Sequence, residues 1–160
     1  EIQKKKWVKD LNIRSNYKDT LIVSLKEEIP FGIYDNSNQK ILFSNNFVVL
    51  EILKNVKQYN DLIIFYGANS IENSKKLFKN FENDFKKNVK SATFLNNRRW
   101  NLQLKNKIVL KLPEENIKLA IKNYNKIYSN FSNSDLKDIE SIDLRIKKKA
   151  IIKYKVQTND

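Results

Sequence analysis

The chain has 160 residues and a formal net charge of +13, from 31 Lys and Arg against 18 Asp and Glu. It contains no Cys and no His, which excludes disulfides, a cysteine nucleophile, a Ser–His dyad and an ordinary zinc site. The only glycines are Gly32 and Gly67, so the sequence offers no phosphate-cradling loop. A carboxylate-only enzyme is still compatible with this composition, but the Asp and Glu residues show no compelling pairing, so we expect no catalysis and no cofactor. The length is sufficient for one domain or for a domain with part of another.

The positive charge is spread along the whole sequence. Runs of three Lys occur only at 4–6 and 147–149. A basic chain is typical of proteins that bind nucleic acid, anionic lipid or acidic partners. Codon bias in an AT-rich genome is the simpler interpretation, because Lys, Asn and Ile dominate while Gly and Pro number two each. The few arginines are Arg14, Arg98, Arg99 and Arg145.

The sequence contains no apolar run near the roughly 20 residues that span a bilayer. The chain begins at Glu1 and contains no Met. We therefore expect it to be a piece of a longer protein, in which a membrane segment could lie upstream.

The first part of the sequence predicts a helix end followed by strands. Residues 1–9 are typical of the end of a helix whose beginning lies upstream. The alternation of side chains at 21–26 predicts a strand. Residues 35–40 have turn chemistry, and 41–43 lead into a second strand. The apolar run within 60–67 predicts a short buried strand.

Two stretches predict helices. Apolar residues recur at helical spacing in 70–88, where Ser70 is a candidate N-cap. A second helix is expected at 114–129, because Pro113 suits a helix start and one side of the segment is apolar. The adjacent Glu114 and Glu115 then fall in its first turn, where the helix dipole favours acids.

Two hairpins are expected in the second half. Alternating apolar residues on either side of Asn106 and Lys107 predict a hairpin over 100–112 with a type I′ turn. A closing hairpin joins strands at 142–146 and 150–154 through the lysines at 147–149. No linker or internal repeat divides the chain. The predicted class is α+β: an antiparallel β-sheet with two main helices packed on one face.

The order of three stretches resembles the bacterial cell division family FtsQ/DivIB. WVKDLNIRSNYKDTLIVSLKEEIPFGIY (7–34) resembles the end of that family's POTRA domain. RRWNLQLKNKIVLKLPEEN (98–116) is similar to its RRW hairpin, and SIDLRIKKKAIIKYK (141–155) to its closing strand pair. The resemblance implies the end of a truncated POTRA domain at 1–30, a complete β domain at 31–156 and a disordered tail at 157–160.

The resemblance also implies a function. Members of this family are bitopic inner-membrane proteins, so a transmembrane helix and the rest of the POTRA domain would lie upstream. This region would then be periplasmic and located at the division septum. It would act as a scaffold of the divisome without catalytic activity, binding FtsB- and FtsL-like proteins and linking early to late division proteins. No nucleic acid is expected as a partner.

In this family FtsB binds by adding a strand to the edge of the β-domain sheet near the C-terminus. An extended edge with free backbone groups suits this mode of binding, and residues 150–155 fit it. Arginine at selected positions of a Lys-rich chain suits bidentate contact with acidic partner residues. The partner-binding residues implied by the resemblance are Arg98, Arg145, Ile146, Lys148, Ile151, Ile152, Lys153 and Tyr154.

Other interpretations of these residues stay open. Arg98 and Arg99 could flank a strand with their stems packed on Trp100, and this is the preferred interpretation for Arg99. Arg145 could pair internally with Asp143 or with an acid of another strand. Tyr154 could be a core residue.

Two residue features depart from the family pattern. Ile146 stands where Tyr is frequent, and the lysines at 147–149 replace small residues. These lysines could also protect an exposed strand from unwanted pairing.

Two alternative functions remain: a basic nucleic-acid-binding module, or a POTRA-type substrate-binding module of a transport or secretion system.

Overall fold

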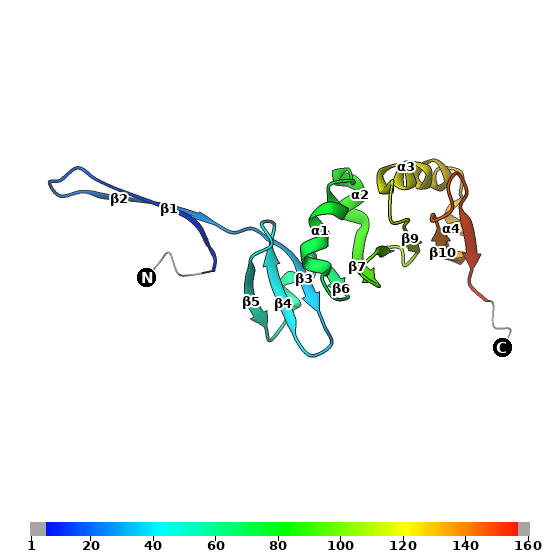
Figure 1. Ribbon diagram of the computed structural model, residues 1–160, viewed down its shortest axis with the longest axis horizontal. Helices are drawn as coiled ribbons and strands as arrows, with labels where there is room; N and C mark the ends of the chain where they lie inside the picture. Colours follow the sequence, from blue (N-terminus) through cyan, green and yellow to red (C-terminus); the bar gives the residue numbers. More distant parts are fainter. Residues whose placement is uncertain (1–5, 157–160) are drawn as a thin grey trace. The chain divides into compact units, whose positions relative to one another are not determined.

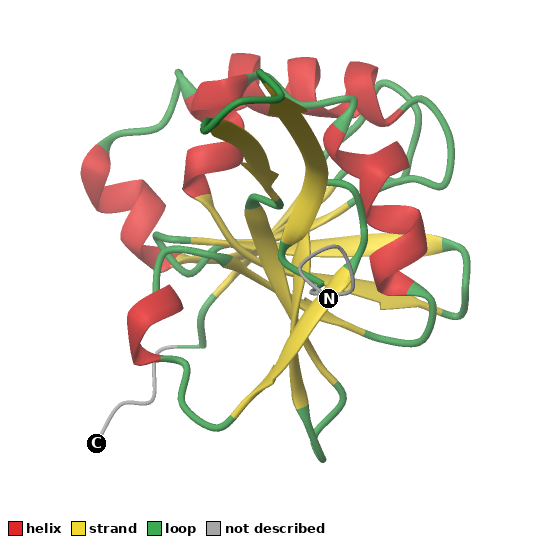
Figure 2. Ribbon diagram, turned by 90° about the vertical axis from the view of Figure 1, so that its left-hand side faces the viewer, coloured by secondary structure: helices red, strands yellow, loops and turns green. Residues whose placement is uncertain are grey.

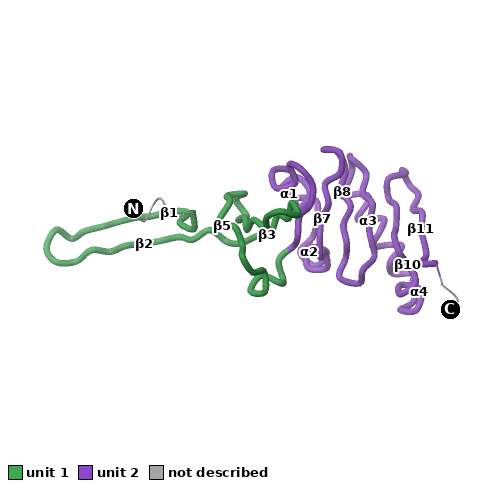
Figure 3. Tube along the Cα trace, turned by 90° about the horizontal axis from the view of Figure 1, so that it is seen from below, with its two compact units in different colours: residues 1–62 green, residues 63–160 purple. Residues whose placement is uncertain are grey.

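The computed structural model describes residues 6–156. The expected tail at 157–160 and the first part of the expected helix at 1–9 lie outside these residues. The chain forms two compact units, residues 1–62 and residues 63–160, which Figure 3 distinguishes by colour.

The first unit begins with an antiparallel hairpin, drawn as a long blue ribbon in Figure 1. It pairs β1 (Val8–Ser15) with β2 (Leu21–Glu27). The strand predicted at 21–26 is therefore confirmed, whereas the predicted helix end is wrong in its described part. Val8 is already in a strand, because the backbone from there onward pairs with β2, and the Trp7 carbonyl accepts a hydrogen bond from the Glu28 N–H.

A three-stranded antiparallel meander completes this unit. It consists of β3 (Pro30–Asp35), β4 (Lys40–Ser44) and β5 (Val49–Leu53), followed by the short 3-10 helix η2 (Lys57–Tyr59). The turn predicted at 35–40 is confirmed, since the side-chain oxygens of Asp35 and Asn36 accept backbone N–H groups there. The small core of this unit is formed by Ile33, Leu42 and Leu50.

The second unit contains a six-stranded, mostly antiparallel arrangement in the order β11-β10-β9-β8-β7-β6. Together with its helices, red in Figure 2, it confirms the predicted α+β class. Two neighbouring pairs, β6 with β7 and β9 with β10, are parallel, because helices connect their strands. The strands are β6 (Ile63–Tyr66), β7 (Val89–Leu95), β8 (Arg99–Leu104), β9 (Val109–Lys111), β10 (Ile139–Asp143) and β11 (Ile151–Tyr154).

The helix expected over 70–88 is two helices, α1 (Ser70–Phe78) and α2 (Asn83–Asn88). The chain turns between them, and the Asn80 N–H bonds the Leu77 carbonyl. Side-chain periodicity did not reveal this break because the phenylalanine contacts continue across it: Phe81 meets Phe85 edge-on with ring centroids 4.9 Å apart. The predicted cap is also wrong: Asn69, at φ 58°, is the N-cap, and Ser70 is the first helical residue.

The second predicted helix begins later than expected. It is α3 (Ile117–Tyr128), followed by the unexpected short helix α4 (Asn133–Asp138). The N-cap of α3 is Asn116 in the left-handed conformation, so Glu114 and Glu115 precede the helix and its first turn has no acid. The dipole argument for these two acids was therefore wrong. The start of α4 has a capping box, in which Ser132 and Asp135 exchange hydrogen bonds.

The hairpin expected over 100–112 is confirmed as β8 and β9. Its turn is not type I′: Lys107 has φ 74°, whereas Asn106 is not among the residues with positive φ in the described chain. The Lys107 N–H bonds the Leu104 carbonyl and closes a tight turn over residues 104–107. Lys107, the left-handed residue, is the last residue of this turn. Trp100, 4% exposed, packs on Phe94 with ring centroids 4.6 Å apart, which places this hairpin in the core.

Candidate partner-binding edge of the sheet

Strand β11 is the terminal strand of the second unit, and within the described chain it pairs only with β10. The register places Ile152 opposite Ile142 and Ile151 opposite Asp143. Ile151 is 53% exposed, although β-branched apolar residues are usually covered in a sheet. The predicted closing strand is thus confirmed as an exposed edge (Figure 1).

The first strand of the closing hairpin lies earlier in the sequence than the predicted 142–146. Strand β10 ends at Asp143, so Leu144, Arg145 and Ile146 lie outside it. A side-chain bond ends the strand, because the Asp143 carboxylate accepts the Arg145 backbone N–H at 3.0 Å. The lysine turn is confirmed: the Lys149 N–H bonds the Ile146 carbonyl, and Lys148 takes φ 61°.

Arg145 makes an internal ion pair with Asp143, as one of the open interpretations held. Its Nε donates to Asp143 Oδ1 at 2.8 Å and to Oδ2 at 3.0 Å. This hydrogen bonding lowers the pKa of the Asp143 carboxyl below its ordinary value. The Arg145 side chain is still 40% exposed, so the guanidinium retains N–H groups for a second acceptor.

Arg98 also has an internal partner. Its Nε lies 3.5 Å from Glu114 Oε2, and both side chains are about half exposed. Arg99 is the first residue of β8 and pairs with Leu95 across the strands. Glu114 thus pairs with Arg98, and it also lines a cavity to which Arg145 contributes.

That cavity has a volume of about 390 Å³ and brings several of the expected residues together. Arg145, Ile146 and Lys148 line it, facing the segment that leads into α3. Sequence reasoning missed the opposite wall, which includes Leu119 and Asn123. The only available signal was that Leu119 lies outside the apolar stripe of its helix, and it is 48% exposed.

The remaining expected residues lie along β11 itself. Lys153 Nζ is 2.7 Å from Glu140 Oε2, which joins the edge strand to its neighbour. Tyr154 is 51% exposed, so it is not a core residue. The pairing continues past the strand, where the Lys155 N–H bonds the Asp138 carbonyl. An exposed aromatic and an exposed isoleucine thus lie on a strand with a free edge.

Two further findings concern the described residues alone. No three acidic side chains among residues 6–156 gather closely enough to hold a metal ion. In the same part of the chain, each helix is too short or too polar to cross a bilayer.

The fold and this edge define an α+β domain with a terminal strand that is open to pairing. Comparison with known families then identifies the class: residues 33–145 match the C-terminal domain of the cell division protein FtsQ/DivIB. The chain belongs to this family. The sequence-based recognition of this family of bacterial cell division proteins is thereby confirmed.

Curated relatives agree with this assignment. The chain is 27% identical over 148 residues to the cell division protein FtsQ of Rhizobium meliloti, covering 91% of this chain and 47% of the relative. It is 29% identical over 149 residues to FtsQ of Rhizobium radiobacter, covering 91% and 70%. FtsQ of Rickettsia felis is 28% identical over 146 residues, covering 86% and 54%. The chain thus spans about half the length of most of these relatives.

Proposed function

We propose that this protein is a non-catalytic scaffold of the divisome, and that it binds FtsB- and FtsL-like partners by strand addition at β11. The observation that carries the proposal is the free edge of β11, which pairs only with β10 in the described chain. A strand with one unpaired edge presents backbone N–H and C=O groups in the spacing that an added strand requires. Family membership supports this function over the nucleic-acid and transport alternatives.

The side chains around the edge support an acidic, partly apolar partner. Ile151 and Tyr154 offer exposed apolar area on the strand itself. Arg145 and Lys148 stand beside it at the lysine turn. A partner carboxylate could share the Arg145 guanidinium with Asp143, because arginine presents its donors as a planar fork.

The hairpin β1–β2 has an exposed apolar face, which supports the proposed POTRA segment. Its register places Leu11 opposite Leu25 and Ile13 opposite Val23, so these apolar side chains share one face. Most of them are exposed: Ile13 is 56% and Val23 49% exposed. An amphipathic ribbon of this kind needs further structure on its apolar face. We propose that residues 1–30 end a POTRA domain whose remaining elements belong to the longer protein.

The proposed location follows from the same family relationship. The protein would be held in the inner membrane by a transmembrane helix outside this chain, with the β domain on the periplasmic side at the septum. The absence of His and Cys supports a binding role rather than catalysis.

A partner peptide with methylated backbone nitrogens tests the mechanism without altering this chain. The peptide would carry the FtsB segment of the same organism, and its affinity would be measured by fluorescence anisotropy. N-methylation at the positions that bond β11 removes donors, so we expect affinity to fall about tenfold or more. Methylation at the alternate positions, whose N–H groups point away from β11, is the control and should have a small effect.

Two protein variants test the same edge from the other side. Ile152→Pro removes a strand N–H, and Arg145→Glu places a negative charge where an acidic partner would bind. Both should weaken binding, whereas Ile52→Pro in the terminal strand β5 should not. Circular dichroism would establish that each variant is folded. Normal binding by folded Ile152→Pro and Arg145→Glu proteins, with equal effects of both methylation patterns, would show that β11 is not the site.

A further inference from the structure

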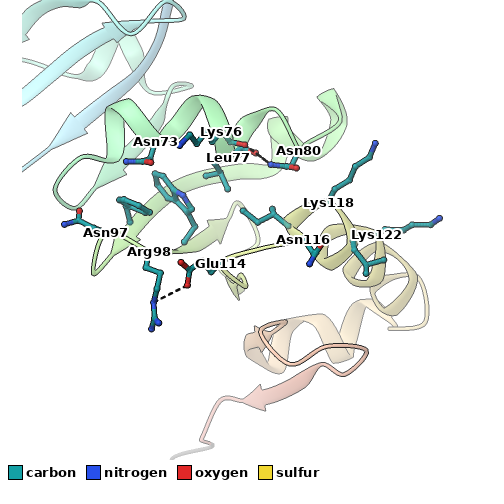
Figure 4. A pocket seen from close by; sticks show the side chains of 14 residues that line it. Asn73, Lys76, Leu77, Asn80, Asn97, Arg98, Glu114, Asn116, Lys118 and Lys122 are labelled. Atoms are coloured by element: carbon teal, nitrogen blue, oxygen red, sulfur yellow. Dashed lines mark hydrogen bonds and ion pairs between the residues drawn. The ribbon is translucent and has the colours of Figure 1, made fainter.

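Two recesses border α3 in the second unit, and they differ in whether their polar groups have partners. The larger one, of about 730 Å³, lies beside α1. Figure 4 shows that the Asn80 amide there donates to the Lys76 carbonyl, at 2.7 Å. It also shows Arg98 paired with Glu114 at the margin of the recess. These polar groups are therefore already engaged within the protein.

The smaller recess has a volume of about 370 Å³, which is within the range of small ligand sites. Residues of α2, of the β8–β9 turn and of the second half of α3 line it. Its apolar wall is formed by Phe85, Leu104 and Tyr124, which are 8%, 3% and 5% exposed. The half-buried Tyr128 lines it as well. We call this recess the Tyr124 pocket.

The hydroxyl of Tyr124 has no hydrogen-bond partner in the described chain. The side chain is almost fully enclosed, so this polar group has lost most of its water without a replacement from the protein. Among residues 6–156, the Ser70 hydroxyl oxygen is the one side-chain polar atom that is both sealed from solvent and unpartnered. The Tyr124 oxygen therefore reaches open space, and the space that this residue lines is the pocket. Burial raises the pKa of the Tyr124 phenol, so the hydroxyl stays protonated and can donate at neutral pH.

The rings behind the pocket form a continuous series. Phe78 meets Phe81 with ring centroids 5.2 Å apart, and Phe81 meets Phe85 at 4.9 Å. Phe85 then meets Tyr124 edge-on at 5.9 Å, and Tyr124 packs on Tyr128 at 5.4 Å. Tyr128 ends this series at the pocket. A further aromatic ring in the pocket would continue the same favourable packing.

The charged groups of the pocket nearly balance, although the chain as a whole carries +13. Glu82, Asp84 and Lys105 line it. The Asp84 carboxylate also lies 3.5 Å from Lys87 Nζ, which offsets its charge. An uncharged ligand therefore suits this pocket better than an anion or a cation.

The amides at the rim offer both a donor and an acceptor. The Asn88 amide nitrogen donates to the Asp84 carbonyl at 3.2 Å, which leaves its side-chain oxygen as an acceptor. The Asn106 side-chain oxygen accepts the Ile108 N–H at 3.2 Å, which leaves its amide nitrogen as a donor. Together with the Tyr124 hydroxyl, these groups suit a ligand that can accept and donate.

A phenol matches these properties. Its ring can continue the aromatic series, and its oxygen can accept the Tyr124 O–H while its own proton goes to a rim oxygen. A phenylalanine ring has no acceptor for Tyr124, and the indole N–H of tryptophan only donates. A sugar has hydroxyls but packs on an open aromatic face, which the enclosed Tyr124 ring does not offer. Among protein side chains, the phenol belongs to tyrosine.

We propose that the Tyr124 pocket binds the side chain of a tyrosine presented by a protein partner. The ring of the bound tyrosine packs against Tyr128, and its oxygen accepts the hydrogen bond from Tyr124. The residues of the pocket come from α2, α3 and the β8–β9 turn, so this site is separate from the β11 edge. It is a second interaction surface and does not depend on the proposed function.

The test titrates the ¹⁵N-labelled protein with the capped tripeptide acetyl-Gly-Tyr-Gly-amide and follows the amide signals by NMR. The signals of the Asn88 and Asn106 side chains should shift, with a dissociation constant on the order of 1 mM for a single side chain. Acetyl-Gly-Phe-Gly-amide should bind about two- to tenfold more weakly, because it cannot accept the hydrogen bond. Acetyl-Gly-Leu-Gly-amide should bind more weakly still.

The variant Tyr124→Phe removes the hydroxyl alone. It should fold normally, since this group has no internal partner, and it should bind the tyrosine and phenylalanine peptides with equal affinity. Tyr59→Phe is the matched control, because it removes a hydroxyl that bonds Glu51 away from the pocket. The preference for the tyrosine peptide should be unchanged in Tyr59→Phe. Circular dichroism would establish that both variants are folded.

Several results would overturn the proposal. These are equal affinities for the tyrosine and leucine peptides, a tyrosine preference that persists in Tyr124→Phe, or no shift of the pocket amides up to the solubility limit of the peptide. Tighter binding of chitotriose than of the tyrosine peptide at the same amides would make the pocket a sugar site instead.

The result can be separated from that for the β11 edge. Ile152→Pro should bind the tyrosine peptide normally, and Tyr124→Phe should bind the strand-adding partner peptide normally. If Ile152→Pro abolished binding of the tyrosine peptide while Tyr124→Phe left it unchanged, the peptide would occupy the edge and the pocket assignment would be wrong.

Discussion

The hairpins β8–β9 and β10–β11 belong to the same unit but differ in what surrounds them. In β8–β9 the alternating residues Trp100, Leu102 and Leu110 are 4%, 0% and 0% exposed, and strands lie on both sides. In β10–β11 the last strand has one neighbour, and Ile151 and Tyr154 are half exposed. The two hairpins have similar sequence patterns, so position in the sheet gives the first a structural role and leaves the second free to bind.

The largest effect should come from breaking the buried hairpin. Trp100→Ala removes a ring that packs on Phe94 and Phe65, so the free energy of unfolding should fall by about 3–5 kcal/mol. Tyr154→Ala at the edge is the matched aromatic truncation and should cost about 1 kcal/mol or less. Urea denaturation followed by circular dichroism measures both. Similar losses in the two variants would contradict the distinction between the hairpins.

A third hairpin, β1–β2, sharpens the comparison because it is exposed but anchored at one end. Glu28, 7% exposed, follows β2 and accepts a hydrogen bond from Asn46 Nδ2 at 2.9 Å. Glu28→Ala leaves the buried Ser44 hydroxyl without this acceptor, which should cost about 1–3 kcal/mol. Glu27→Ala, at the exposed neighbouring residue, is the control and should have a much smaller effect in the same denaturation experiment.

The pH dependence of Glu28 follows from its hydrogen bonds. Bonds from Ser44 and Asn46 lower the pKa of the Glu28 carboxyl below its ordinary value of 4.5. A folded-state pKa below the unfolded one stabilises the fold above the unfolded pKa, and this contribution is lost as the pH falls through the folded value. The acid-induced loss of stability should therefore be smaller in Glu28→Ala, and an identical pH profile would contradict the role of Glu28.

The smallest effect is expected at the Arg145–Asp143 pair. Arg145→Ala should change the free energy of unfolding by about 1 kcal/mol or less, because the pair is partly exposed. The same change should raise the pKa of the Asp143 carboxyl toward its ordinary value, since the Arg145 hydrogen bonds lower it. Carbon-detected NMR titration would measure this shift. Arg98→Ala should leave the Asp143 pKa unchanged; a pKa that stayed low in Arg145→Ala would refute the assigned cause.

Alternation and helical periodicity predicted most of the strands and helices, but polar residues decide where several of them begin and end. The strand pattern at 142–146 continued to Ile146, whereas the chain leaves β10 at Asp143, where its carboxylate bonds the Arg145 backbone. Similarly, Asn69 and Asn116 begin their helices in the left-handed conformation. Asp143, Asn69 and Asn116 are polar residues that interrupt no apolar pattern, so periodicity contained no signal for these element ends.

The candidate site was predicted in part. The exposed closing strand and the location of Arg145, Ile146 and Lys148 beside it follow from the chain order. The wall formed by Leu119 did not, because it comes from a helix that is separated in sequence from the edge and meets it only in three dimensions. The Arg98–Glu114 pair had no signal in the sequence, whereas the Arg145–Asp143 pair is one of the internal pairings that the sequence suggests.

Amide hydrogen exchange measured by NMR, with and without the FtsB-like peptide, tests the central claim most directly. In the free protein, the β11 N–H groups that do not bond β10 should exchange fast, whereas those of β8 should be protected. Strand addition predicts that the peptide slows exchange at the outward-facing N–H groups within Ile151–Tyr154, and leaves β8 unchanged. Saturating peptide that protected other residues and left β11 exchanging at its free rate would contradict the account.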